Sequence, residues 1–192
     1  MTEQAVPIQP PRRAGQSNVP QDDAREHILV LFVNDRPGSV DRVVGVLRRR
    51  RANMQTLTIG RSELADVARV TVVVDDSEVG VEQLVEQLRK VVDVRHIVNL
   101  STAQAVAREL ALIKVSSTPG SSSEIIELGH QFGAHPVDVT AETVTLEVTG
   151  SEEKVTKIVE LLQPYGIREI ARTGCVAMTR GAANADDSNN QS

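Results

Sequence analysis

Apolar residues between residues 26 and 101 follow first the period of a strand and then the period of a helix. Residues 27–33 form a nearly continuous apolar run, typical of a strand buried on both faces. Two later stretches have the spacing i, i+3, i+4, i+7 of a helical stripe. These stripes are Val40, Val43, Val44 and Leu47, and then Val81, Leu84, Val85 and Leu88. Further strands are predicted at residues 53–59, 67–74 and 92–100, so the order is β-α-β-β-α-β.

The second half of the chain repeats this order. Strands are predicted at residues 109–115, 135–140, 143–149 and 167–178. Helical stripes are formed by Ile125, Leu128, Gly129 and Phe132, and by Val155, Ile158, Val159 and Leu162. Ser151 suits the start of the last helix, because its hydroxyl can accept a hydrogen bond from a free N–H group. The expected fold is α+β, with two tandem ferredoxin-like βαββαβ modules, antiparallel sheets and helices on one face.

The pattern also suggests how the chain is divided. Residues 1–25 are rich in proline, glutamine and charge and are expected to be a disordered tail, as are residues 182–192. The two modules occupy residues 26–101 and 102–181. In such a module the helices cover only one face of the sheet, and the other face needs a cover from the same chain or from a second one. A homo-oligomer is therefore expected, most simply a C2 dimer.

Composition excludes several classes of function. The net charge is −5 and aromatic residues make up 2% of the chain, which argues against nucleic acid and anionic membrane as partners. No apolar run approaches the length that spans a bilayer, and the N-terminus lacks the apolar stretch of a signal peptide. Cys175 is the single cysteine, so no internal disulfide can form, and a cytoplasmic location is expected.

No constellation of catalytic residues is apparent. The histidines, His27, His96, His130 and His135, have neither helical i, i+4 spacing nor a neighbouring set of metal ligands. Cys175 lies in an apolar stretch without a nearby base and reads as a small core residue. Glycine-rich phosphate loops are absent. We therefore expect a protein that is not an enzyme and holds no catalytic residue, metal or cofactor of its own.

Two polar segments stand out. The first is the turn at residues 34–40, where the N–H groups of Gly38, Ser39 and Val40 at a helix start could bind a carboxylate. Asp35 could take the ammonium group of the same amino acid. The alternative is an ordinary strand-to-helix turn in which Asp35 caps the helix. The second segment is the arginine run 48–51, with Arg42 upstream, which fits a solvated face or a partner surface better than a nucleic-acid site in an acidic chain.

Several segments resemble one known family. DRPGSVDRVVGVLRRRRANMQTLTIGRSE and VTVVVDD with VEQLVEQLRKVVDVRHIVNL resemble the ACT domain of acetolactate (acetohydroxyacid) synthase small subunits. In the second half, ARELALIKV, HPVDVT and EIARTGCVAMTRG resemble the same family. The combination is specific, and it extends over about residues 26–181. The resemblance assigns residues 26–101 to an ACT domain for effector binding and dimerisation, and residues 102–181 to a C-terminal ferredoxin-like domain.

The resemblance implies a regulatory subunit without catalysis of its own. Its partner would be a large catalytic subunit that carries thiamine diphosphate, Mg and FAD. The regulatory subunit would activate this large subunit. It would also confer feedback inhibition by a branched-chain amino acid, most typically valine. Members of the family bind the effector between two ACT domains, which here implies Asp35, Gly38, Ser39 and Val40 of one chain with Asn53 and Thr58 of the other. A stand-alone amino-acid sensor that regulates another enzyme is the alternative.

Two positions depart from the family pattern. The family usually has asparagine at the position of Asp35, so this chain places an additional negative charge in the loop. It also usually has glycine and an aromatic residue at the positions of Arg51 and Ala52. Glycine commonly supplies the left-handed conformation that ends a helix. Valine sensitivity is therefore open at these positions, and so is the identity of the effector.

Overall fold

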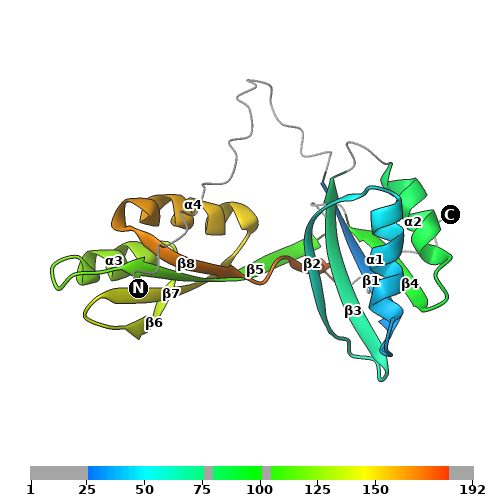
Figure 1. Cartoon of the computed structure of the whole chain (residues 1–192), viewed down its shortest axis with the longest axis horizontal. Coiled ribbons are helices and arrows are strands. Elements are labelled where there is room, and N and C mark those ends of the chain that lie inside the picture. Colours follow the sequence, from blue (N-terminus) through cyan, green and yellow to red (C-terminus); the bar gives the residue numbers. More distant parts are fainter. Residues whose placement is uncertain (1–25, 76–79, 101–104, 182–192) are drawn as a thin grey trace, which may run out of the picture.

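The computed structural model describes residues 26–75, 80–100 and 105–181, which form two βαββαβ modules joined by one long strand (Figure 1). The predicted tails, residues 1–25 and 182–192, lie outside the described residues. The first module consists of β1 (Glu26–Asn34), α1 (Ser39–Arg49), β2 (Asn53–Arg61), β3 (Val67–Asp75), α2 (Val81–Arg89) and β4 (Val94–Leu100). Its antiparallel strands have the order β2-β3-β1-β4. Since β1 is an inner strand, the continuous apolar run at its centre is buried on both faces.

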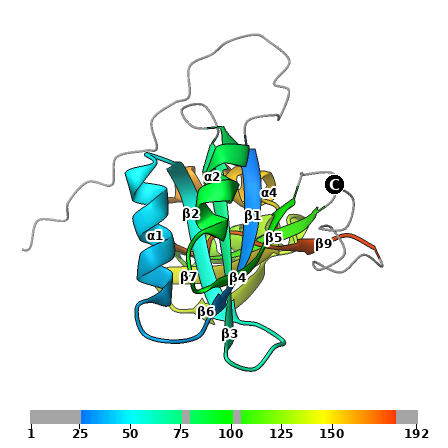
Figure 2. The ribbon, with the colours of Figure 1, turned by 90° about the vertical axis from the view of Figure 1, so that its right-hand side faces the viewer.

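Helices α1 and α2 lie side by side on one face of the first sheet (Figure 2). Their apolar stripes bury Val43, Leu47, Leu84 and Leu88 against Leu29, Leu31 and Val33 of β1 and the facing residues of β3. Each helix has an acidic residue in its first turn and arginine in its last, which complements the helix dipole. The helical spacing of apolar residues in the sequence therefore predicts both helices and their buried faces correctly.

The second module repeats this arrangement. Its elements are β5 (Ala105–Ser116), α3 (Ser122–Gln131), β6 (His135–Val139), β7 (Thr143–Gly150), α4 (Glu152–Leu162), a 3-10 turn (Gln163–Tyr165), β8 (Ile167–Arg172) and β9 (Val176–Thr179). The order across the sheet is β6-β7-β5-β8, with every pair antiparallel. Ser151 caps α4 as predicted, because its hydroxyl accepts a 3.4 Å hydrogen bond from the N–H of Lys154. The predicted fold is confirmed.

One predicted strand is wrong in its extent. Residues 167–178 do not form a single strand, because Gly174, with φ 80°, separates β8 from β9. A positive φ is readily adopted by glycine and ends the extended run. β9 leaves the second sheet and pairs with residues 105–108 at the start of β5, so that β5 begins four residues before the predicted residue 109.

The start of β5 and β9 cover the outer face of the first sheet. Ala105 and Ala177 pack there against Ile28, Val30 and Phe32, with Cys175 partly buried beside them. Arg69 joins the two parts, since its guanidinium lies 5.0 Å from the ring centre of Phe32 and donates a 2.7 Å hydrogen bond to the Ala177 carbonyl. The first module therefore receives its cover from its own chain. No helix within the described residues is long and apolar enough to cross a membrane.

Candidate effector-binding loop

The turn between β1 and α1 is held at both of its ends by backbone hydrogen bonds. The N–H of Asn34 donates to the Asp93 carbonyl at 2.9 Å, and the N–H of Asp35 donates to the Asp66 carbonyl at 2.9 Å. The side-chain oxygen of Asn34 also accepts a 2.6 Å hydrogen bond from Arg95. The loop is thus fixed by segments that precede β3 and β4, and its conformation exists before any ligand binds.

The buried carboxylate of Asp93 holds the loop in place through two arginines. The Asp93 side chain is fully buried and accepts from the guanidinium groups of both Arg36 and Arg42. These hydrogen bonds lower the pKa of Asp93 from 3.8 to about 2, with the bond from Arg42 contributing most, although burial acts in the opposite direction. Asp93 was not among the predicted site residues, because a single acid in a turn carries no pattern that connects it with arginines more than fifty residues away.

The start of α1 has unused hydrogen-bonding groups. Gly38 adopts φ 83° and precedes the helix, which has no side-chain cap. Within the described residues, the N–H groups of Gly38 and Val40 have no acceptor, and the buried Ser39 hydroxyl has no partner. The Ser39 N–H, which the sequence analysis counted as free, instead donates to the Arg36 carbonyl at 3.2 Å. The start of α1 therefore has two backbone N–H groups without acceptors, and the Ser39 hydroxyl next to them is buried.

Asp35 does not cap the helix, so the capping role predicted for it in an ordinary strand-to-helix turn is wrong. Its side chain is exposed and forms no ion pair with any described residue. Arg36, the neighbouring cation that could have neutralised it, pairs with Asp93 instead. The Asp35 carboxylate is consequently available to a cation that approaches the loop.

Asn53 and Thr58 lie elsewhere in the same chain. In the strand register Asn53 faces Asp75, whereas Asn34 faces Val67, so Asn53 and the loop are at opposite ends of the sheet. The Thr58 hydroxyl donates to the Thr173 carbonyl at 3.3 Å on the outer face. A single chain does not bring these two residues to the loop, and their place in a shared site stays a prediction that needs a second chain.

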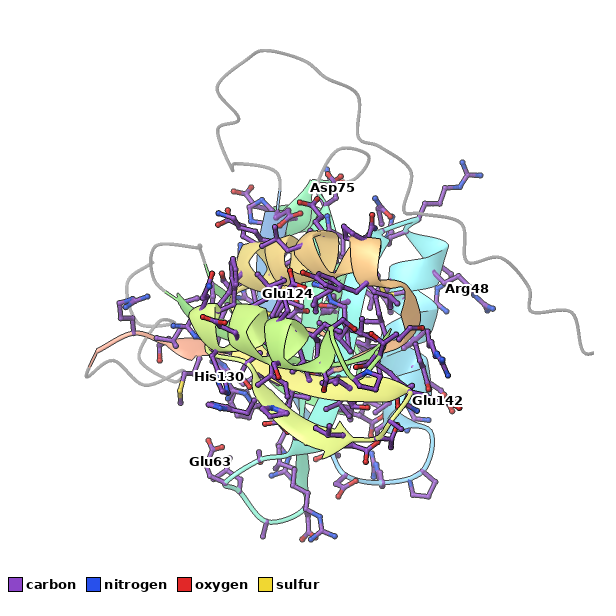
Figure 3. The ribbon with its side chains drawn as sticks, turned by 90° about the vertical axis from the view of Figure 1, so that its left-hand side faces the viewer. Arg48, Glu63, Asp75, Glu124, His130 and Glu142 are labelled. Carbon is purple, nitrogen blue, oxygen red and sulfur yellow. The ribbon has the colours of Figure 1, made fainter. Side chains whose placement is uncertain are left out.

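The arginine run lies at the far end of α1. Arg48 to Arg51 are exposed, and none pairs with an acid among the described residues; Arg48 extends away from the helix (Figure 3). Arg51 has φ 54° and ends the helix, with its N–H bonded to the Arg48 carbonyl and the Ala52 N–H bonded to the Leu47 carbonyl. These two bonds form a Schellman motif, in which glycine normally occupies the left-handed position.

The corresponding loop of the second module is closed. Thr118, Pro119 and Gly120 come before α3 as Arg36, Pro37 and Gly38 come before α1. There the Ser121 hydroxyl accepts from the Thr118 N–H at 2.9 Å, and the Thr118 carbonyl accepts from the N–H groups of Ser121 and Ser122. The loop of the first module is therefore the better candidate for binding a ligand.

The described residues contain no group of three or more histidine, cysteine or acidic side chains placed to hold a metal ion. Cys175 is half-buried, and burial raises the pKa of its thiol, in keeping with a small packing residue.

Comparison with known proteins covers both modules. The family described as "AHAS small subunit-like ACT domain" matches residues 29–96, and the one described as "Small subunit of acetolactate synthase" matches residues 108–181. The acetolactate synthase small subunit of Bacillus subtilis is 41% identical over 165 residues, which are 85% of this chain and 96% of that protein. The probable small subunit of Archaeoglobus fulgidus is 42% identical over 156 residues, 81% of this chain and 98% of that protein.

A solved structure agrees with these sequence comparisons. The crystal structure of the acetolactate synthase small subunit of Thermotoga maritima matches with a TM-score of 0.77 and 34% identity, covering 83% of this chain and 99% of that one. The fold and these matches define a regulatory protein of the ACT-domain class. The chain belongs to the family of acetolactate synthase small subunits. Membership implies a catalytic large subunit as its partner.

Proposed function

We propose that this chain is the non-catalytic subunit that activates an acetolactate synthase large subunit and subjects it to feedback inhibition by a branched-chain amino acid. Valine is the effector we favour, in the biosynthesis of valine, leucine and isoleucine. The chemistry, with thiamine diphosphate, Mg and FAD, would belong to the large subunit. A cytoplasmic location suits this role. The names of the relatives support the assignment to a small subunit.

One observation carries the effector proposal: the start of α1 has free donors beside a free acid. The N–H groups of Gly38 and Val40 would bind the carboxylate of an amino acid, where the helix dipole also favours negative charge. The Asp35 carboxylate would accept the ammonium group. Because Asp93 holds Arg36 and Arg42, the loop needs little reordering, which lowers the cost of binding.

A homodimer would complete this site. Loop 34–40 and Asn53 lie at opposite ends of one sheet. A two-fold axis perpendicular to the sheet reverses the direction of the second copy, so it would bring the loop of one chain to Asn53 of its partner. An effector bound there would favour one arrangement of the dimer. A large subunit that prefers another arrangement would bind more weakly when the effector is present. By thermodynamic linkage, the large subunit would weaken effector binding by the same factor.

The test measures acetolactate formation by the cognate large subunit with and without this chain, and then with valine, leucine or isoleucine. Stimulation by the chain that valine reverses is the expected result. Stimulation without a response to any of the three amino acids would refute the effector proposal and keep the regulatory subunit. Absence of stimulation, with a folded chain and an active large subunit, would refute activation and favour a sensor for another enzyme.

A matched pair of variants tests whether inhibition by the amino acid depends on the loop. Asp35→Ala should weaken inhibition by removing the acceptor for the ammonium group. Asp41→Ala removes an equally exposed acid from the first turn of α1, outside the loop, and should leave inhibition unchanged. Equal responses of the two variants would show that Asp35 has no specific role.

A further inference from the structure

Residues 173–175, which connect β8 with β9, lie against the outer face of β2 (Figure 1). The Thr173 carbonyl accepts a 3.3 Å hydrogen bond from the Thr58 hydroxyl, and the Cys175 N–H donates to the Thr56 hydroxyl at 3.5 Å. Thr56 and Thr58 point to the same side of β2, because side chains alternate along a strand. We call residues 173–175 the latch, since they attach the second module to the edge strand of the first.

Gly174 brings the backbone of the latch into direct contact with β2. Its φ is 80°, in the left-handed region that glycine adopts readily. A Cβ at this position would lie 3.0 Å from Oγ1 of Thr58 and 3.2 Å from Cβ of Thr56. Both distances are shorter than ordinary van der Waals contact. A larger residue at position 174 would therefore push the latch away from β2.

The latch is also bonded to the second module. The Thr173 N–H donates to the Leu110 carbonyl of β5 at 3.0 Å, and the Leu110 N–H donates to the Thr173 hydroxyl at 3.1 Å. The preceding residue, Arg172, pairs with the buried carboxylate of Glu109. Thr173 thus binds β5 through its N–H and its hydroxyl, and binds β2 through its carbonyl. A single residue is therefore hydrogen-bonded to both modules.

The two bonds between the latch and β2 are the weaker part of this arrangement. They are 3.3 and 3.5 Å long, which is longer than usual, whereas the bonds to β5 are 3.0 and 3.1 Å long. A hollow of about 410 Å³ lies beside the latch, between Thr56 of β2 and Glu152 of α4. A shift of β2 would therefore break its bonds to the latch before it disturbed those to β5, and the hollow leaves room for the shift.

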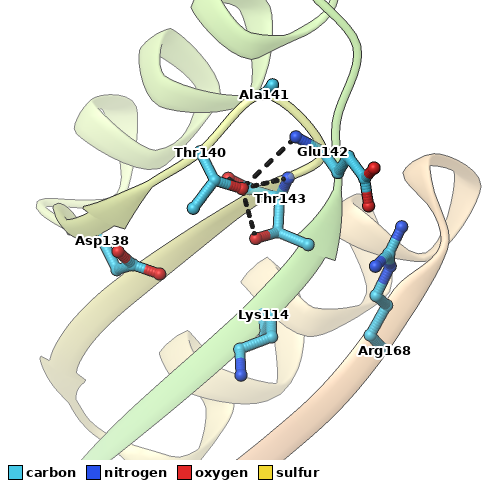
Figure 4. Close-up of a pocket in the computed structure, with 7 residues that line it drawn as sticks. All are labelled: Lys114, Asp138, Thr140, Ala141, Glu142, Thr143 and Arg168. Carbon is cyan, nitrogen blue, oxygen red and sulfur yellow. Dashed lines mark hydrogen bonds between the residues drawn. The ribbon is translucent and has the colours of Figure 1, made fainter.

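A hollow on the outer face of the second sheet differs from the one beside the latch (Figure 4). Its volume is about 500 Å³, and its lining residues all belong to the second module, among them Lys114 and Arg168. The turn at its edge is closed on itself, because the Thr140 hydroxyl accepts from the N–H groups of Glu142 and Thr143, at 3.3 and 3.0 Å. A movement between the modules would leave this hollow unaltered, whereas it would open or close the hollow beside the latch.

The strand that carries the latch also belongs to the predicted effector site. Asn53 is the first residue of β2 and is predicted to meet an effector bound at loop 34–40 of a partner chain. Within the described residues, β2 is an edge strand that pairs with β3 on one side. It can therefore shift at a lower free-energy cost than an inner strand, and Thr56 and Thr58 would move with it.

We propose that the latch transmits the state of the effector site to the second module, an inference that rests on the proposed feedback inhibition. Without effector, the latch lies on β2 and holds the modules in the orientation that activates the large subunit. The effector, bound beside Asn53, shifts β2 and breaks the bonds from Thr56 and Thr58 to the latch. The second module then tilts against the first, and activation falls. By linkage, a chain whose latch is already detached binds the effector more tightly.

Gly174→Ala tests the latch, with Gly166→Ala as the matched control. Gly174 follows β8 and Gly166 precedes it, and their φ angles are 80° and 84°. Alanine therefore strains the backbone similarly at the two positions. A Cβ on Gly166, however, would meet Ser116 of the second module at an ordinary 3.6 Å. Thr56→Ala is a milder variant, which removes the hydrogen-bond acceptor of Cys175 without a clash.

The measurements are acetolactate formation with the cognate large subunit, and valine binding to the full chain by isothermal titration calorimetry. Gly174→Ala should behave like the inhibited form, with less stimulation in the absence of valine and little further change when valine is added. It should bind valine about fivefold more tightly than the unaltered chain. Thr56→Ala should act in the same direction with a smaller effect, and Gly166→Ala should match the unaltered chain. Tighter binding separates a detached latch from general damage, which would weaken binding.

Residual dipolar couplings of the backbone amides in the ¹⁵N-labelled chain test the latch without an activity assay. Gly174→Ala should change the orientation of one module relative to the other, as should valine added to the unaltered chain. An unchanged orientation in Gly174→Ala would overturn the proposal, and so would equal responses of the two glycine variants. A normal response of Gly174→Ala to valine would also overturn it. Failure of the proposed feedback inhibition would look different, because valine would then leave the activity with the unaltered chain unchanged.

Discussion

Arg36 and Asp93 are 57 residues apart in the sequence, and the Arg36 Nε donates a 2.8 Å hydrogen bond to Oδ1 of Asp93 at the loop between β1 and α1. Arg42 binds the other carboxylate oxygen. The loop before α1 is therefore anchored to the turn before β4 by one fully buried carboxylate. This contact makes the conformation of the candidate site depend on the charge of Asp93.

Asp93→Asn should change how stability depends on pH. The pKa of Asp93 is lowered from 3.8 to about 2 in the folded chain, so the ionised carboxylate stabilises the fold fully above about pH 4. This contribution is lost as the pH falls through about 2. Urea denaturation at several pH values should show the free energy of unfolding of the two proteins converging between pH 4 and 2. Parallel curves would contradict the prediction, and Asp41→Asn serves as the exposed control.

Arg51→Gly should stabilise the chain. Arg51 has φ 54°, and a left-handed conformation costs a residue other than glycine about 1 kcal/mol. The expected gain of about 1 kcal/mol should raise the Tm by about 2–4 °C. Arg49→Gly, at the last residue of α1, should instead destabilise by up to about 1 kcal/mol because glycine is unfavourable in helices. A change of the Tm in the same direction for both variants would refute this account.

The two buried hydroxyls that lack a partner among the described residues should respond to substitution in the same way. Ser39→Ala and Thr145→Val remove groups whose burial is uncompensated, so each should stabilise the unliganded chain, by about 1 kcal/mol in denaturant unfolding. Ser151→Ala offers the contrast, because this serine caps α4 and its loss should cost about 1 kcal/mol. Destabilisation by Ser39→Ala or Thr145→Val would mean that the hydroxyl has a partner in the folded chain.

Gly129 and Gly45 should respond oppositely to alanine. A Cβ on Gly129 would lie 3.1 Å from Leu146 Cδ1 and 3.7 Å from the Ala134 Cβ, so the buried Leu146 side chain or α3 would have to shift. Overpacking of this kind typically costs about 1–3 kcal/mol. A Cβ on Gly45 would meet only the terminal guanidinium of Arg49, at 3.5 Å, and alanine there should stabilise α1 by about 1 kcal/mol. Similar unfolding curves for the two variants would contradict the packing at Gly129.

The period of the apolar residues was sufficient to predict the helices, the strand order in sequence and the buried faces. It could not predict that β9 leaves the second sheet, because residues 167–178 keep a strand-like pattern and Gly174 is the one local sign of the break. Asp93 could not be found either, since its partners are distant in the sequence. Asp35 was predicted as a site residue from the sequence. That its carboxylate is not paired with Arg36 follows from the ion pair between Arg36 and Asp93, which only the three-dimensional structure shows.

β5 belongs to both halves of the molecule. Its first four residues pair with β9 over the outer face of the first sheet, and the rest pair with β7 and β8 in the second. The strand contains neither glycine nor proline, so it offers no joint at which the backbone could bend easily. A rotation of the first module relative to the second would therefore have to bend a strand that is hydrogen-bonded to neighbouring strands along its whole length.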